Sequence, residues 1–289
     1  MRQSKLMPIL LLLPFFIITA MIIIAVAVVL MQSLGWIPAF GLTELSLEYY
    51  SEILTDSDFL SSLSVSLRVS IISTVIAAVL GVVICAAVIS RGKSAFPFIV
   101  RFPILVPHAV VAVFAINILS QTGLIARIAY ALGIIADYGD FAQLLYTDSF
   151  AGVIAAYVWK EAPFVAFFIY ALMVSVSSSL GEAAQNLGAS PLRSFFTITL
   201  PLSMPAIANA SFIIFVFSFA GYELPMLLGA TLPKALPIKA FLEFTSPDLL
   251  NRPYAMAANG ILLIFSVIAA LLYLIAIKYT IKRTGGKNE

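Results

Sequence analysis

Six long apolar stretches alternate with shorter and more polar connections along the chain. Each contains roughly 20 or more residues, the length that a helix needs to cross the hydrocarbon core of a bilayer. The stretches run approximately over residues 8–31, 62–89, 96–119, 150–174, 202–225 and 255–279. The pattern therefore predicts an all-α polytopic membrane protein with six transmembrane helices.

Prolines are expected to interrupt three of the predicted spans. They are Pro97, Pro103 and Pro107 in the third span, Pro163 in the fourth and Pro205 in the fifth. A proline removes a backbone donor and tends to kink a helix, and lipid does not satisfy the freed carbonyl. These positions fit kinked helices around a pathway, and they also fit the ordinary tolerance of membrane helices for proline.

The composition excludes a water-soluble domain. Of the 289 residues, 62% are hydrophobic and 10% are charged, and the mean hydropathy is +1.09, whereas soluble domains contain about 25% charged residues. The formal net charge of +2 gives no basic surface of the kind that binds nucleic acid. Cys85 is the single cysteine, which excludes an intramolecular disulfide and a cysteine-based zinc site.

The positions of lysine and arginine predict the orientation of the spans, because short loops rich in these residues stay in the cytoplasm. With the N-terminus inside, nine basic residues fall on the cytoplasmic side: Arg2, Lys5, Arg91, Lys93, Arg193, Lys278, Lys282, Arg283 and Lys287. Four fall outside: Arg127, Lys234, Lys239 and Arg252. The first outer loop carries acidic residues only: Glu44, Glu48, Glu52, Asp56 and Asp58. We therefore expect both termini in the cytoplasm.

The cytoplasmic connection between the fourth and fifth spans contains helix-start and helix-stop signals. Ser179 and Glu182 have the S-x-x-E spacing of a capping box, which predicts the start of a short helix. Gly188 stands where that helix needs a left-handed residue after its end. Ser190 and Pro191 then offer an N-cap and a first helical residue for a second short helix. We predict two helices joined by a glycine, the second ending near residue 201.

The same connection has the composition of a docking surface. Ala183 and Ala184 keep one face small enough for another backbone to approach, while Leu187, Phe195 and Phe196 supply apolar side chains. An amphipathic connector packed on the protein's own cytoplasmic face has the same composition, so the residues by themselves leave both interpretations open.

Several residues at fixed spacing in this connection match a known motif. The pattern EAA-x3-G-x9-I-x-LP is formed by Glu182, Ala183, Ala184, Gly188, Ile198, Leu200 and Pro201. It resembles the EAA loop of binding-protein-dependent ABC importer permeases. The resemblance implies an N-terminal anchor followed by a five-helix permease core, and it implies that the loop docks on a separate ATPase. By this resemblance the docking residues include the motif residues together with Leu187 and Arg193.

The resemblance also implies a division of the chain. Residues 1–61 form the anchor and acidic outer loop, residues 62–279 form the core with the coupling loop at 175–201, and residues 280–289 form a cytoplasmic tail. The apolar run that begins the chain continues past a site resembling a signal-peptide cleavage site, so we expect it to remain as a transmembrane anchor.

No segment of the sequence has the G-x-x-x-x-G-K-[ST] pattern of a phosphate-binding loop. We expect this chain to bind no cofactor and to catalyse no reaction, with ATP and Mg bound by the partner. The resemblance implies two ABC ATPase subunits, a second permease subunit that is identical or different, and an extracytoplasmic substrate-binding protein. It places the chain, surrounded by lipid and without nucleic acid, in the plasma (inner) membrane of a prokaryote.

The stretches at 219–229 and 232–237 look like those of spermidine/putrescine-type permeases. This resemblance implies import of a polyamine or a similar small solute. Related permeases import ferric iron, sulfate, molybdate or phosphonates, and these stay alternatives. A secondary transporter driven by an ion gradient and an integral-membrane enzyme are alternatives from other classes. The coupling loop disfavours the first, and the scarcity of histidine and cysteine disfavours the second.

Charged residues inside the predicted spans are candidates for a translocation path, because each is costly to place in a bilayer. Lys160 and Glu161 lie deep in the fourth span, and being adjacent they point about 100° apart and pair poorly with each other. An interhelical ion pair is the alternative. Tyr222 and Glu223, near the outer end of the fifth span, offer an aromatic face and a carboxylate to an ammonium group. His108 has no partners at metal-ligand spacing, and we expect a hydrogen-bonded interior residue there.

Overall fold

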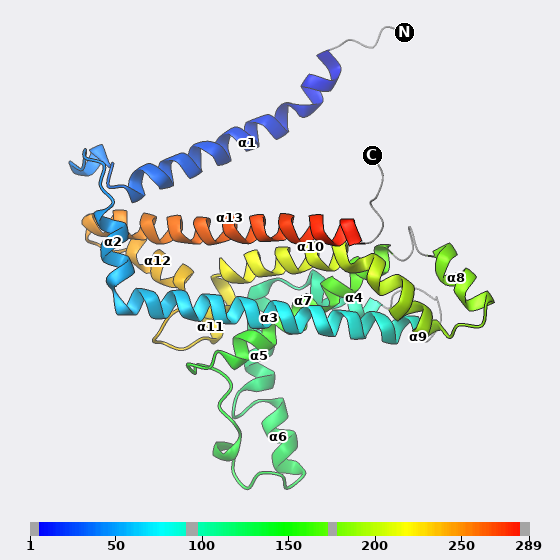
Figure 1. Ribbon diagram of the computed structural model, residues 1–289. Coiled ribbons are helices and arrows are strands. Elements are labelled where there is room, and N and C mark those ends of the chain that lie inside the picture. The colour runs from blue at the N-terminus through cyan, green and yellow to red at the C-terminus, as the bar shows by residue number, and fades with distance from the viewer. Residues whose placement is uncertain (1–5, 91–97, 173–177, 284–289) are drawn as a thin grey trace. The chain divides into compact units, whose positions relative to one another are not determined.

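The computed structural model describes residues 6–90, 98–172 and 178–283, and within these ranges the chain is almost entirely helical and contains no β-strand (Figure 1). The long helices are α1 (Leu6–Ser33), α3 (Ser57–Ser90), α7 (Ala151–Leu172), α10 (Leu200–Phe219) and α13 (Arg252–Arg283). The shorter helices are α2 (Glu48–Thr55), α4 (Phe98–Leu105), α5 (His108–Leu119), α6 (Leu124–Ala131), α8 (Ser178–Asn186), α9 (Pro191–Ser194), α11 (Glu223–Leu228) and α12 (Leu236–Phe244).

Six helical segments of the described chain are long and apolar enough to cross a membrane. They are Leu10–Ser33, Ser57–Val88, His108–Ala131, Ala151–Leu172, Pro191–Phe219 and Leu249–Lys278. The predicted number of spans and the all-α class are confirmed. The predicted orientation stays a prediction, and five of the basic residues that carry it lie outside the described ranges: Arg2, Lys5, Arg91, Lys93 and Lys287.

The chain forms two compact units. One comprises Met1–Leu60 with Lys239–Leu263, and the other comprises Ser61–Ile238 with Ile264–Glu289. The predicted division at residues 61 and 279 stays a prediction.

The first unit contains the acidic outer loop, and part of that loop is held by specific contacts. Lys239 Nζ donates a hydrogen bond of 2.8 Å to Asp56 Oδ2. The Tyr254 hydroxyl donates to Glu52 Oε2. The bond from Lys239 is the main reason that the pKa of the Asp56 carboxyl lies below its ordinary value. These two acidic side chains are therefore part of the packing of the first unit.

The second unit is built around α7, which packs on α3, α4, α5 and α10. Two hydrophobic clusters run along it, one around Val153 and Tyr157 and the other around Val165 and Ile169, and all four side chains are buried. Gly81 of α3 lets the two helices approach closely, since a Cβ at that position would lie 2.5 Å from Val165 Cβ. The close packing fixes the side chains of α7 relative to their neighbours.

Two predicted spans differ from their expected form. The third is interrupted, because α4 ends at Leu105 and α5 begins at His108 with Pro107 as its N-cap. In the fourth and fifth spans the helix is instead continuous through the proline: Pro163 lies inside α7, and Pro205 lies inside α10. Proline thus breaks one span and is accommodated in the other two.

The fifth span begins earlier and ends earlier than expected. The predicted end of the second short helix near residue 201 is wrong, because α9 continues through a π-helical turn (Phe195–Thr199) directly into α10. In this wider turn the Leu200 N–H donates to the Phe195 carbonyl, five residues earlier. At the other end α10 stops at Phe219, so residues 220–222 form a connector and α11 is a separate short helix.

Candidate functional site

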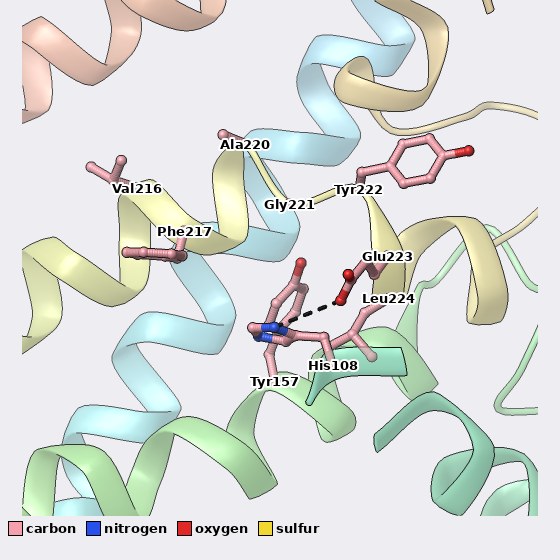
Figure 2. Close-up of a pocket in the computed structure, with 9 residues that line it drawn as sticks. All are labelled: His108, Tyr157, Val216, Phe217, Ala220, Gly221, Tyr222, Glu223 and Leu224. Carbon is pink, nitrogen blue, oxygen red and sulfur yellow. Dashed lines mark ion pairs between the residues drawn. The ribbon is translucent and has the colours of Figure 1, made fainter. Parts of the chain in front are cut away.

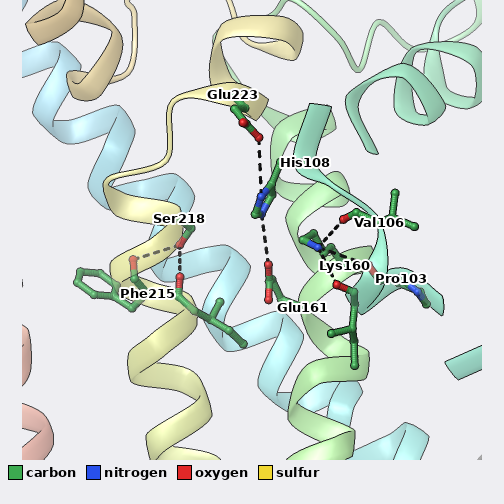
Figure 3. A network of polar contacts seen from close by, with 10 residues as sticks. Pro103, Val106, His108, Lys160, Glu161, Phe215, Ser218 and Glu223 are labelled. Atoms are coloured by element: carbon green, nitrogen blue, oxygen red, sulfur yellow. Dashed lines mark hydrogen bonds and ion pairs between the residues drawn. The ribbon is translucent and has the colours of Figure 1, made fainter. Parts of the chain in front are cut away.

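The break between α4 and α5 is occupied by the ammonium group of Lys160. Its Nζ donates hydrogen bonds to the carbonyl oxygens of Val106 at 2.7 Å, Ile104 at 3.3 Å and Pro103 at 3.4 Å (Figure 3). Lys160 is buried, with 9% of its surface exposed. The negative end of α4 and the positive side chain therefore stabilise each other where lipid offers no donor.

The break also sets the position of His108, the first residue of α5. Its Nε2 lies 3.6 Å from Glu161 Oε1, and its Nδ1 lies 3.9 Å from Glu223 Oε2 (Figure 3). Glu161 comes from the middle of α7 and Glu223 is the first residue of α11. Three separate segments of the chain thus bring one imidazole between two carboxylates.

A cavity of about 460 Å³ opens beside this cluster (Figure 2). The residues that line it are His108, Tyr157, Val216, Phe217, Ala220, Gly221, Tyr222, Glu223 and Leu224. The ring of Tyr157 packs edge-on against His108, with centroids 6.1 Å apart. In Figure 2 the Tyr222 ring points away from His108, so Tyr157 is the aromatic ring of the cluster. The cavity combines carboxylate and aromatic surface, which is a suitable environment for an ammonium group.

The connector between α10 and α11 forms one wall of the cavity. A Cβ at Gly221 would collide with the hydroxyl oxygen of Tyr157 and would lie 2.8 Å from the carbonyl oxygen of Phe217. Glycine is therefore required for the connector to pass this close to α7. That approach carries Glu223 to the side of His108.

The predicted path residues divide into two groups. Glu161 and Glu223 meet at His108, and Tyr222 and Glu223 line the cavity. Lys160 is not among the lining residues, since its Nζ bonds the end of α4. Adjacent residues 160 and 161 thus point to different partners, as their spacing on a helix predicts.

Two residues of the cluster were missed by sequence reasoning. His108 was expected to be an ordinary interior residue, and Tyr157 was not singled out. The side chain of His108 is 30% exposed, and it lines the cavity. Among the described residues no group of three or more His, Cys, Asp or Glu side chains could hold a metal ion.

The second candidate site is the loop around Gly188. Gly188 has φ of +93°, a left-handed conformation that glycine adopts without strain. Its N–H donates to the Gln185 carbonyl, and the Ala189 N–H donates to the Ala184 carbonyl. These two bonds are the Schellman motif that ends a helix. The predicted glycine stop is confirmed.

The second helix of the loop starts as predicted. The Ser190 hydroxyl accepts a hydrogen bond from the Arg193 N–H, and Pro191 is the first helical residue. Ser194 Oγ donates to the Gly181 carbonyl and thereby joins α9 to α8. The predicted capping box of Ser179 and Glu182 lies outside the described residues, because the structure does not describe these two side chains.

The loop exposes apolar side chains. Leu187 is 90% exposed and Phe196 is 52% exposed. Phe195, predicted as part of the same surface, is instead 1% exposed and packs in the cluster around Val165. The two rings contact each other edge to face, with centroids 5.1 Å apart, but only Phe196 is exposed enough to contact another protein.

The remaining motif residues are distributed over α8, α9, the π turn and the start of α10. Ala183, Arg193 and Pro201 are exposed, whereas Ala184, Ile198 and Leu200 are half-buried. The exposed group faces solvent, and Leu200 packs against the core cluster that contains Phe195.

Comparison with known proteins identifies the class of the chain. Residues 78–280 match the family described as "Binding-protein-dependent transport system inner membrane component". This match covers more than half of the chain. The chain therefore belongs to that family. The resemblance inferred from the EAA-type motif and the location in the inner membrane are confirmed.

The relatives differ in what their names say they transport. The putrescine transport system permease protein PotI of Escherichia coli (strain K12) is 28% identical over 200 residues, 68% of this chain and 66% of that protein. The molybdate/tungstate transport system permease protein WtpB of Pyrococcus abyssi is 29% identical over 184 residues, 63% of this chain and 64% of that protein. The chain thus spans just under two thirds of these two relatives.

Longer similarity extends to other family members. The sn-glycerol-3-phosphate transport system permease protein UgpA of Escherichia coli O157:H7 is 30% identical over 283 residues, 92% of each chain. The crystal structure of a bacterial ABC transporter involved in the import of the acidic polysaccharide alginate has a chain with a TM-score of 0.71 at 20% identity. The match covers 98% of this chain and 95% of that chain. The structural likeness supports the fold.

Proposed function

We propose that this chain is the permease subunit of an ATP-driven importer and that its loop around Gly188 couples a separate ATPase to a translocation path. The observation that carries the proposal is the loop itself. It is a capped helix, a left-handed glycine and a second capped helix, and it presents the exposed Leu187 and Phe196. An apolar surface on so short and polar an element fits a groove on a partner better than it fits water.

The path from the loop to the cavity is one helical rod. The segment Pro191–Phe219 has 29 residues, and it runs through the π turn without a break. At 1.5 Å per residue such a rod is roughly 40 Å long. The loop lies at its start and the wall formed by residues 220–222 at its end. When an ATPase displaces the loop, this helix therefore transmits the movement to the wall of the cavity. Such transmission supports alternating access driven by ATP.

For the substrate, we favour a polyamine such as putrescine or spermidine. Glu161 and Glu223 converge at His108, which lines the cavity together with Glu223, and the ring of Tyr157 adds an aromatic face. Carboxylates attract ammonium groups and repel molybdate, sulfate and other anions. The relative named as a putrescine permease is consistent with this choice.

The proposal includes the partners that the chain lacks. Two ABC ATPase subunits bind ATP and Mg, a second permease closes the path, and an extracytoplasmic binding protein delivers the solute. This chain binds no cofactor and catalyses no reaction. Both termini lie in the cytoplasm, together with the Gly188 loop.

Coupling is tested with the complete importer in proteoliposomes. In Leu187→Asp a charge replaces the most exposed apolar side chain of the loop. We expect ATP-dependent uptake and substrate-stimulated ATPase activity to fall together, by about tenfold or more, in a complex that still assembles. Leu132→Asp is the matched control, because Leu132 is a 70% exposed leucine directly after the end of α6. Uptake that persists without ATP while an ion gradient is intact would contradict the proposal.

The substrate is tested separately through the cognate binding protein. We expect putrescine or spermidine to raise its thermal unfolding midpoint, because a ligand that binds the folded state stabilises it. Stabilisation by molybdate, sulfate or a phosphonate and by neither polyamine would overturn the polyamine assignment while leaving the coupling proposal intact.

A further inference from the structure

His108 occupies a position between two carboxylates that a bound cation would also occupy. Each of its ring nitrogens faces a different carboxylate, Glu161 on one side and Glu223 on the other. A protonated imidazole has an N–H for each of them, whereas a neutral ring has only one N–H to donate. At this position a protonated ring can direct one N–H toward each carboxylate.

The two carboxylates differ in their access to water. The side chain of Glu161 is 14% exposed, and that of Glu223 is 56% exposed. Glu223 and His108 line the cavity and Glu161 does not, so a cation in the cavity has Glu223 and the imidazole as its nearest partners. His108 is thus placed as the inner barrier of the carboxylate pair.

Other titratable groups lie near His108. They are Tyr157 and Lys160 from α7 and Tyr222 from the connector before α11, in addition to the two carboxylates. The Lys160 ammonium is fixed by three carbonyls at the end of α4. A proton on the ring can instead leave to water in the cavity, because His108 is 30% exposed.

We propose that His108 is an exchangeable counter-ion: its protonated ring holds the Glu161–Glu223 site while the path is empty, and an ammonium group of the substrate takes its place during import. This inference rests on the proposed import of a cationic solute. The ring releases its proton to water when the substrate binds, and it regains a proton when the substrate leaves. His108 then selects for cations, because only a positively charged group can take its place between the two carboxylates.

The chain contains a single histidine, which makes the exchange directly observable. The complete importer is assembled from this chain, labelled with nitrogen-15 in histidine, and unlabelled partners, and the ring nitrogens are followed by NMR over a pH series. We expect saturating putrescine to lower the titration midpoint by about one pH unit, a tenfold loss of proton affinity, because the diamine and the proton compete for the same carboxylates.

Two isosteric variants and a control sharpen the test. Glu161→Gln and Glu223→Gln are each expected to lower the midpoint without putrescine and to weaken the putrescine response, and either variant suffices if the other fails to assemble. Glu44→Gln, at an exposed position of the outer loop, is expected to behave as the unmodified chain.

The outcomes separate the counter-ion from the proposed substrate. A midpoint that putrescine leaves unchanged overturns the exchange, and if the same importer takes up putrescine, the proposed function stands. A midpoint that falls with putrescine in an importer that does not take it up supports the exchange site and overturns the polyamine assignment. A midpoint that neither carboxylate variant moves shows that His108 does not bridge the pair.

Discussion

Two helix interruptions of the second unit meet at the same cluster but are maintained in different ways. The α4–α5 break contains Pro107 and is held by a buried ammonium, that of Lys160. The α10–α11 connector instead depends on Gly221, whose missing side chain lets it pass beside Tyr157. A charged side chain stabilises the first break, whereas the absence of a side chain at Gly221 makes the second one sterically possible. We infer that the first forms the static wall of the cavity and that the second is the part free to move.

The largest expected effect comes from removing the charge at the first break. Lys160→Met leaves the carbonyls of Val106, Ile104 and Pro103 without their donor. We expect a loss of about 3 kcal/mol in the free energy of unfolding, because buried acceptors lose bonds to a charged donor. Thermal or denaturant unfolding of the purified importer in detergent measures it.

The matched control for this variant is Lys278→Met, which removes an exposed lysine near the end of α13. It is expected to change stability by about 0.5 kcal/mol or less. Equal stability of the two variants would show that the first break does not depend on its ammonium group and would remove the contrast between the two interruptions.

The second interruption is tested by adding one methyl group. Gly221→Ala places a Cβ against the Tyr157 hydroxyl and the Phe217 carbonyl. We expect a cost of about 2 kcal/mol, which is ordinary for overpacking a close contact. In the Tyr157→Phe background the hydroxyl is absent, so the cost of the same change should fall by about half or more. A double-mutant cycle in unfolding free energy measures this coupling.

If the effects of Gly221→Ala and Tyr157→Phe on the unfolding free energy were additive, the result would contradict the close approach of the connector to α7. The same four proteins also report on movement. If the connector moves during transport, Gly221→Ala should reduce uptake more than it reduces the binding of ATP by the partner. Tyr157→Phe should partly restore that uptake.

The two sites also differ in how far sequence reasoning could reach them. Gly188 and Ser190 act on backbone groups a few residues away, so their spacing predicted both the helix stop and the N-cap that the structure contains. The cluster at the cavity joins residues 108, 161 and 223, and no local rule relates these positions. Periodicity identified the spans, but it did not distinguish Pro107, which ends a helix, from Pro163, which lies inside one.

Phe195 and Phe196 illustrate the same limit within the loop. Both are apolar and both follow the second helix start, so composition assigned them to one surface. In the structure their rings contact each other edge to face, yet Phe195 is buried in the core cluster around Val165 and Phe196 is 52% exposed. The burial of Phe195 depends on its contacts with α7, which no local pattern in the loop could predict.

The smallest expected effect provides a scale for the charge at the first break. Lys239 and Asp56 form an ion pair in the first unit, with side chains 21% and 44% exposed. Solvent screens such a pair, so Asp56→Asn should cost only about 0.5 kcal/mol. Because the pKa of Asp56 in the folded chain lies below its ordinary value, this contribution is present above about pH 4 and is lost as the pH falls through the lowered value. Unfolding midpoints of the two proteins should therefore differ slightly at pH 7 and converge in acid. A difference at pH 7 as large as that of Lys160→Met would show that exposure, which separates the two lysines, does not decide what a charge contributes in this fold.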